Sequence, residues 1–300
     1  MTTKQNAESV LAKKAVLTVL TISQWSARRF DKKLTEDVHA SHGMQQDAGR
    51  YNKVLLSKAA LEKIYQASNK ARQVNWDMTL PWMDMDGQRL LPTKSYLDYT
   101  NKMRQLKEEF STAVAEFTRN YPAYVEEAKK RLNGAFNPAD YPPADQVKHR
   151  FGFDVAIMKC PDADFRCEIS EDDLKDIEAD VKRRLDDGLQ KAQAHALEKA
   201  AALVGHMVEK LASYKPADKD AGEKAEGVFR DSLVENLREF VPLLRTFNLH
   251  DDPKVNALAD KMEAELCQHD AADLRESDNA REKVAKAAEK ILADVSKFMA

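Results

Sequence analysis

The chain has 300 residues, of which 43% are hydrophobic and 32% charged, with a formal net charge of −3. Its 9 glycines and 10 prolines are too few for the turns of a β-sandwich or barrel, and 47 basic against 50 acidic residues leave no overall basic excess for nucleic acid. No run reaches the roughly 18 apolar residues of a membrane span, and the N-terminus lacks a signal-peptide core, so we expect a cytoplasmic protein of a bacterial host cell.

The first third of the chain predicts a strand followed by helices. Residues 15–25 are rich in β-branched side chains and alternate roughly between apolar and polar, which favours a strand. Helices are predicted over 34–46 and 53–72. The segment 74–92 contains two prolines and an Asp-Gly pair, which predict a short hairpin or an ordered loop.

The strongest pattern in the chain follows, with apolar residues at steps of three and four over about four heptads. These residues are Tyr96, Tyr99, Met103, Leu106, Phe110, Ala113, Phe117, Tyr121, Tyr124 and Ala128. They predict a helix over 93–132 that ends at Asn133-Gly134. Pro122 lies inside this helix and predicts a kink or a break near Tyr121.

A connector, residues 134–168, separates this helix from a second long one. Within it, 151–159 predicts a strand that is able to pair with 15–25 in a small sheet. The second helix is predicted over 170–213. It starts at Ser170, whose hydroxyl is suited to cap the first amide groups.

The two long helices define the predicted architecture, which is mainly α with a small β element (α+β). Each spans about 60 Å at 1.5 Å per residue, so its apolar seam needs a partner helix. We predict an antiparallel hairpin of 93–133 and 170–213 on a small α+β base, all within a domain 1–214. A linker, 215–224, and a C-terminal helical module, 225–300, follow. Helices of that module are predicted at 225–240, 253–268 and 279–299, with a break near Pro242.

No catalytic motif is evident, and neither the phosphate-binding loop nor the dinucleotide-binding glycine pattern occurs. His39 and His42 lie one helical turn apart, but no third ligand stands at the spacing of a zinc site. The other polar groups considered are His195 with His206, Cys160 and Cys167 with His149, and Asp77, Asp84 and Asp86. Ordinary structural roles explain all of them better, so we expect no enzyme, no metal and no cofactor.

One candidate partner-binding segment is rich in Trp and Met, which are enriched in protein interfaces. Its residues are Trp76, Met78, Trp82, Met83 and Met85. The alternative interpretation is a loop folded onto the base of the helices.

Three basic clusters are candidate nucleic-acid contacts. They are Arg28 and Arg29, then Lys129, Lys130 and Arg131, and then Lys182, Arg183 and Arg184. Binding would require them to converge with aromatic residues on one face. A cation at a helix C-terminus also suits the helix dipole without any further role.

The segment 21–34, TISQWSARRFDKKL, precedes a long helical middle and a late Phe-Gly-Phe-Asp strand. With Ile22, Trp25 and Arg28–Arg29 as its main matching points, the chain resembles, over about 14–215, an uncharacterised helical family of phages, prophages and integrative elements. Genes of that family often neighbour genes for MoxR-type AAA+ ATPases and von Willebrand A-domain proteins. The resemblance implies a mobile-element origin and such an ATPase or A-domain protein as a partner.

Three functions follow as hypotheses. The first is a non-enzymatic scaffold that binds protein partners or assembles with copies of itself, favoured by the long seams and the absent catalytic motifs. The alternative is a nucleic-acid-binding protein in phage replication, recombination or counter-defence, favoured by the basic clusters. The third is an enzyme of unrecognised class that uses His39 and His42 or the group of Asp77, Asp84 and Asp86.

Overall fold

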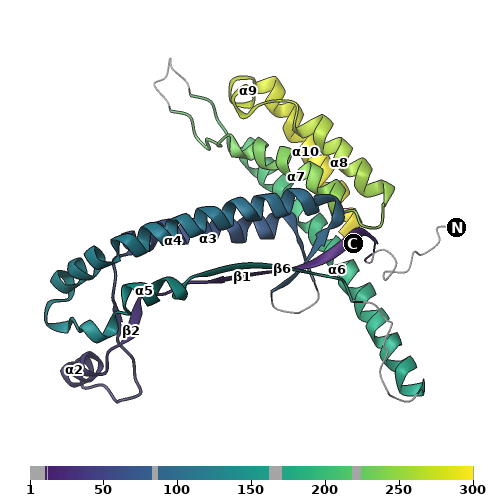
Figure 1. Cartoon of the computed structure of the whole chain (residues 1–300). Coiled ribbons are helices and arrows are strands. Elements are labelled where there is room, and N and C mark those ends of the chain that lie inside the picture. Colours follow the sequence, from purple (N-terminus) through teal and green to yellow (C-terminus); the bar gives the residue numbers. More distant parts are fainter. Residues whose placement is uncertain (1–10, 12, 83–86, 162–170, 218–223, 300) are drawn as a thin grey trace. The chain divides into compact units, whose positions relative to one another are not determined.

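The computed structural model describes residues 11, 13–82, 87–161, 171–217 and 224–299 (Figure 1). About 70% of it is helical and it contains a small antiparallel sheet of four strands, so the predicted fold class is confirmed. The chain divides into two compact units, each built from separate stretches of sequence. Unit 1 comprises Met1–Thr18, Met78–Tyr96 and Ile157–Ala300, and unit 2 comprises Val19–Asp77 and Leu97–Ala156.

The four-stranded sheet has the order β4-β5-β1-β6. Its strands are β1 (Ala15–Ser23), β4 (Leu80–Pro81), β5 (Gln88–Pro92) and β6 (Gly152–Met158). Both predicted strands and their pairing are confirmed, because β1 and β6 are neighbours. Of the two alternatives for 74–92, the hairpin is present in its later part, where β4 and β5 pair antiparallel, whereas residues 74–78 belong to the preceding helix.

Unit 2 contains a long helical pair and a smaller two-stranded ribbon. Its helices are α2 (Lys32–His42), α3 (Lys58–Met78, whose last residue belongs to unit 1), α4 (Tyr96–Leu132, whose first residue does) and the short α5 (Ala144–Val147). Its ribbon strands are β2 (Arg28–Phe30) and β3 (Asn52–Val54), and its 3-10 turns are Asn133–Ala135, Pro138–Asp140 and Lys148–Arg150. The Asp31 side chain caps α2 by accepting from the Leu34 amide, and Gly43 ends it with a positive φ of 63°.

Eight of the ten predicted seam residues are buried on α4, which is continuous through Pro122, whereas Tyr96 is 38% exposed and Tyr124 is half-buried. The helix therefore does not break at Pro122. A proline removes only one backbone hydrogen bond, and the neighbouring Tyr121 is buried. The partner of α4 differs from our expectation. It is α3, which lies beside it in unit 2 (Figure 1), whereas 171–213 belongs to unit 1.

Two ion pairs show that α3 and α4 run antiparallel, Lys63 with Glu116 and Lys70 with Glu109. The seam of α4 also packs on β6 and the residues beside it, where the Phe110 and Phe153 ring centroids lie 5.7 Å apart. An apolar seam requires a cover, and α3 with the strands supplies it.

Unit 1 is a helical body on one hydrophobic core. Its helices are α6 (Glu171–Ser213), α7 (Ser232–Phe247), α8 (Pro253–Leu266), α9 (Ala271–Glu276) and α10 (Asp278–Met299), with a 3-10 turn at Thr93–Ser95. The apolar stripe of α6 packs against α7 and α10, so the C-terminal helices share its core. The helix expected at 225–240 begins only at Ser232 and continues through Pro242. The predicted cap Ser170 lies outside the described residues.

Candidate functional site

The Trp- and Met-rich segment is mostly interior. The side chains of Trp82 and Met78 are 1% and 4% exposed, because the β4–β5 hairpin turns Trp82 into the core of unit 1. Trp76 is 50% exposed at the end of α3. Met83 and Met85 lie outside the described residues. Among the described residues of this candidate set, only Trp76 is exposed and thus accessible to a partner.

The histidine pair has a structural explanation. His39 is buried, and its Nε2 lies 3.1 Å from the carbonyl oxygen of Gly49, a contact that ties α2 to the following loop. His42 is exposed in the last turn of α2. Within the described ranges, no three His, Cys, Asp or Glu side chains are grouped closely enough to hold a metal ion.

The described cysteines are unsuited to thiolate chemistry. Burial raises the pKa of the Cys160 thiol to about 11, and burial also raises the pKa of Cys267. Cys167 lies outside the described residues, as do Asp84 and Asp86. Asp77 accepts a hydrogen bond from Gln73 on its own helix, which explains it without a site.

His195 and His206 both lie on α6. His195 is half-buried, and burial together with the charge of Arg89 lowers its pKa, so it is neutral at pH 7. None of the described helices is both long enough and apolar enough to pass through a bilayer.

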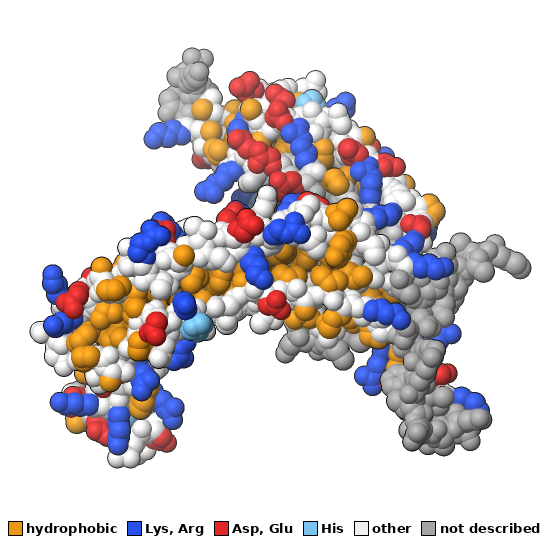
Figure 2. All heavy atoms as spheres, in the orientation of Figure 1, with side chains coloured by type: hydrophobic (Ala, Val, Ile, Leu, Met, Phe, Trp, Pro, Cys, Tyr) orange, Lys and Arg blue, Asp and Glu red, His pale blue; other side chains and the backbone are white. Residues whose placement is uncertain are grey.

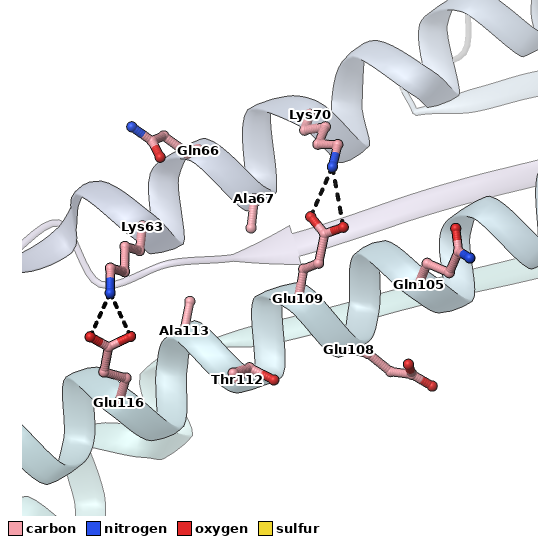
Figure 3. Close-up of a pocket in the computed structure, with 10 residues that line it drawn as sticks. All are labelled: Lys63, Gln66, Ala67, Lys70, Gln105, Glu108, Glu109, Thr112, Ala113 and Glu116. Atoms are coloured by element: carbon pink, nitrogen blue, oxygen red, sulfur yellow. Dashed lines mark hydrogen bonds and ion pairs between the residues drawn. The ribbon is translucent and has the colours of Figure 1, made fainter.

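A groove of about 810 Å³ lies between α3 and α4 (Figure 3). Ala67 and Ala113 lie in its middle, and the two ion pairs of Lys63 and Lys70 cross it from helix to helix. Both lysines are thus already neutralised by glutamates, and a third glutamate, Glu108, adds negative charge. Both lysines among the described residues that line the groove are paired with carboxylates, so the groove does not suit an anionic ligand.

Two of the three basic clusters meet at the ribbon of unit 2. In the antiparallel register of β2 and β3, Arg28 lies opposite Val54. The Nη2 of Arg131 donates a hydrogen bond to the carbonyl oxygen of Val54 at 2.9 Å. Lys129 and Lys130 are exposed beside Arg131 in the last turn of α4. Two clusters far apart in the sequence therefore flank one residue.

An aromatic ring lies among these arginines. Alternation along β2 places Phe30 on the same side as Arg28, and 47% of Phe30 is exposed. The guanidinium carbon of Arg50 lies 5.8 Å from the centroid of its ring. We call the surface formed by Arg28, Phe30, Arg50, Val54 and Arg131 the ribbon face. Rings and arginines together are able to stack on bases and pair with phosphates.

Charge is segregated toward this part of unit 2. The segments 28–58 and 124–150 carry twelve Lys and Arg against eight Asp and Glu, an excess of four positive charges. Since the whole chain is at −3, the remainder has an excess of seven negative charges. Figure 2 shows the blue side chains gathered over α2 and β2 at lower left. This part of unit 2 therefore carries a local positive excess despite the acidic total.

A buried ion cluster supports the ribbon from its other side. The side chain of Lys53 is 4% exposed, and its Nζ lies 2.8 Å from Asp31 Oδ2 and 2.7 Å from Asp140 Oδ2. The Asp140 Oδ2 atom is buried and accepts no well-aligned hydrogen bond from the described residues. Burial alone lowers the pKa of Lys53, but Asp140 and Asp31 outweigh it and raise this pKa above 10.5. The Lys53 hydrogen bond, aided by the Leu34 amide, lowers the pKa of Asp31. The cluster thus stays charged at neutral pH and fixes β3 against 135–140.

A second hollow, of about 430 Å³, adjoins the ribbon within unit 2. We call it the arginine hollow; it is lined by Trp25, Ser26, Arg28, Arg29, Leu55, Ala139, Asp140, Tyr141, Pro142, Pro143, Gln146 and Arg150. Among the described residues, Arg28 and Arg150 have no carboxylate partner, and Arg29 lies 3.7 Å from Asp140. Two arginines without a carboxylate partner in the described part of the chain therefore border this hollow.

The third basic cluster lies elsewhere. Lys182, Arg183 and Arg184 are exposed on α6 in unit 1. Arg183 and Arg184 both pair with Asp180, and these hydrogen bonds lower the pKa of that carboxyl. Local pairing therefore accounts for much of the charge of this cluster.

Several residues of the site were not anticipated from the sequence, namely Phe30, Arg50, Val54, Tyr141 and Arg150. Phe30 carried a usable signal, because an Arg-Arg-Phe run in an extended segment alternates its side chains between two faces. The others required the register of β2 and β3 and the path of the connector.

No family model, no curated protein and no solved structure matches the chain. The resemblance to the mobile-element family therefore remains a hypothesis.

Proposed function

We propose that this protein binds nucleic acid through the ribbon face and acts without catalysing a reaction. The observation that carries the proposal is the meeting of Arg28 and Arg131 at Val54, beside an exposed phenylalanine. Arginines placed around an exposed ring suit a sugar-phosphate backbone with accessible bases. The resemblance to a mobile-element family supports a role in replication, recombination or counter-defence.

The test is the binding of a fluorescently labelled single-stranded oligonucleotide, followed by anisotropy at low salt. We expect the Arg28→Gln/Arg131→Gln variant to bind about tenfold more weakly, because each lost phosphate contact weakens binding and flattens the salt dependence. Arg104→Gln is the matched control, because Arg104 is exposed on the same helix roughly 40 Å from Arg131. Equal affinities for all three proteins would exclude the ribbon face.

A protein-binding function is the second candidate, favoured by two exposed apolar side chains in unit 2. Trp76 is 50% exposed near the end of α3, and Leu97 is 73% exposed near the start of α4. Exposed tryptophan is common at interfaces. The partners to consider are a second copy of this chain and the MoxR-type ATPase or von Willebrand A-domain protein that the resemblance implies.

Light scattering coupled to size exclusion tests self-association. We expect the protein to elute as a defined oligomer and the Trp76→Ser/Leu97→Ser variant as a monomer, because the change removes the apolar contact. A monomeric starting protein would exclude self-association through this surface. A titration with the purified ATPase would then test the other partner.

A further inference from the structure

The arginine hollow differs from the α3–α4 groove in what its charges are paired with. In the groove, both lysines are bound by glutamates. In the hollow, the single carboxylate, Asp140, already contacts the buried Lys53 at 2.7 Å. Arg28 and Arg150 are left without a carboxylate among the described residues. The hollow is thus positive and suited to an anion.

Guanidinium groups select among anions by geometry. Their planar forks match the oxygens of a phosphate and bind it through two hydrogen bonds. Arg28, Arg29 and Arg150 border the hollow from two elements, β2 and the turn after α5. Arg29 lies 3.7 Å from Asp140, so Arg28 and Arg150 are the groups that a phosphate monoester would engage.

The walls of the hollow are aromatic and held in place. The Trp25 ring packs edge-on against Tyr121, with centroids 6.1 Å apart. The Tyr141 hydroxyl donates to the carbonyl oxygen of Leu55 at 3.0 Å, and its ring stacks on Phe136 at 5.2 Å. Rigid rings beside a cationic pocket favour a ligand with a flat ring attached to its phosphate.

The backbone beside the hollow is strained. Ala27 lies between Trp25 and Arg28 and has a φ of 47°, a left-handed conformation that is unfavourable for alanine because of its Cβ. It is buried, and its carbonyl oxygen accepts from the Leu55 amide at 2.7 Å. Such strain persists where surrounding contacts hold it, and it is frequent at ligand sites.

From these observations we infer that the arginine hollow binds a nucleoside monophosphate unit, with the phosphate at the arginines and the base near Trp25 and Tyr141. Its volume of about 430 Å³ suits one such unit and is too small for a duplex. Arg28 belongs both to the hollow and to the ribbon face. This inference rests on the proposed function in one respect, because an unpaired nucleotide of the bound strand is the natural source of the unit; a free nucleotide is the other.

Calorimetric titration of the full chain with AMP, adenosine and inorganic phosphate tests the inference. We expect AMP to bind at least tenfold more tightly than adenosine or phosphate, because only AMP engages both the arginines and the rings. We expect Arg150→Gln to weaken AMP binding at least tenfold and Arg104→Gln to leave it unchanged. Trp25→Phe should keep most of the affinity, whereas Trp25→Ser should lose it.

Two results would overturn the inference: AMP binding no tighter than phosphate, or AMP binding unaffected by Arg150→Gln. Arg150 is exposed and has no described partner, so its replacement should leave thermal unfolding unchanged. Different results would contradict the proposed function, so the two proposals are tested separately. Oligonucleotide binding that depends on Arg131 but occurs without AMP binding removes only the hollow. AMP binding without oligonucleotide binding removes only the ribbon face and identifies the free nucleotide as the source.

Discussion

At the scale of single residues, Lys53 shows how a buried charge supports an exposed surface. Its partner in the antiparallel register is Arg29 of β2, and the outer side of β2 carries the ribbon face. Lys53 points inward and also donates to the carbonyl oxygen of Ala135 at 2.8 Å. Removing one member of a buried cluster leaves the other charges unpaired, which is costly.

We therefore predict that Lys53→Met lowers the free energy of unfolding at pH 7 by about 3–5 kcal/mol. Urea denaturation measures this change. Lys63→Met, at an exposed ion pair in the same unit, should cost less than about 1 kcal/mol. Equal costs would show that the Asp31–Lys53–Asp140 cluster contributes no more than a surface pair.

The same cluster predicts a dependence of stability on pH. The pKa of Asp31 is lowered below 3.8 in the folded state, so its contribution is present above 3.8 and is lost as pH falls through the folded value. The pKa of Lys53 is raised above 10.5, so its contribution is present below 10.5 and is lost as pH rises through the folded value. Lys53→Met should flatten the acid limb of a plot of unfolding free energy against pH.

At the scale of elements, α4 shows that neighbouring residues contribute very differently to the free energy of unfolding. Phe117 is buried, with ring contacts to Phe151 at 5.4 Å and Tyr121 at 5.7 Å. Glu116, the preceding residue, makes the exposed ion pair with Lys63 and no other ion pair within the described ranges. The helical period places one on the packed face and the other on the solvent face.

Phe117→Ala should therefore lower the free energy of unfolding by about 3–5 kcal/mol, because a large ring leaves a cavity. Glu116→Ala should change it by less than about 1 kcal/mol. Urea denaturation at pH 7 compares the two. Similar losses would mean that α4 does not bury the seam on which this description depends.

At the scale of the whole molecule, the distribution of charge matters more than its total. A chain at −3 is not a promising nucleic-acid binder by composition, yet two segments of unit 2 hold an excess of four positive charges. Binding through them should weaken with salt, since each phosphate contact releases counterions. The Arg28→Gln/Arg131→Gln variant should show a weaker salt dependence. The rest of the chain has an excess of negative charge and cannot replace the lost phosphate contacts.

Local pattern alone determined much of this protein. The seam of α4, the strands 15–23 and 152–158 and the helical C-terminus follow from periodicity, because burying one face imposes a period of 3.6 or 2 residues. The basic clusters at Arg28 and at Lys129–Arg131 were visible as composition. Tertiary structure alone decided that α3 covers α4, that Trp82 is interior, and that Arg28 and Arg131 meet at Val54. A periodic pattern says that a face is buried but not against which partner, because that choice depends on contacts between distant segments, summed over the whole fold.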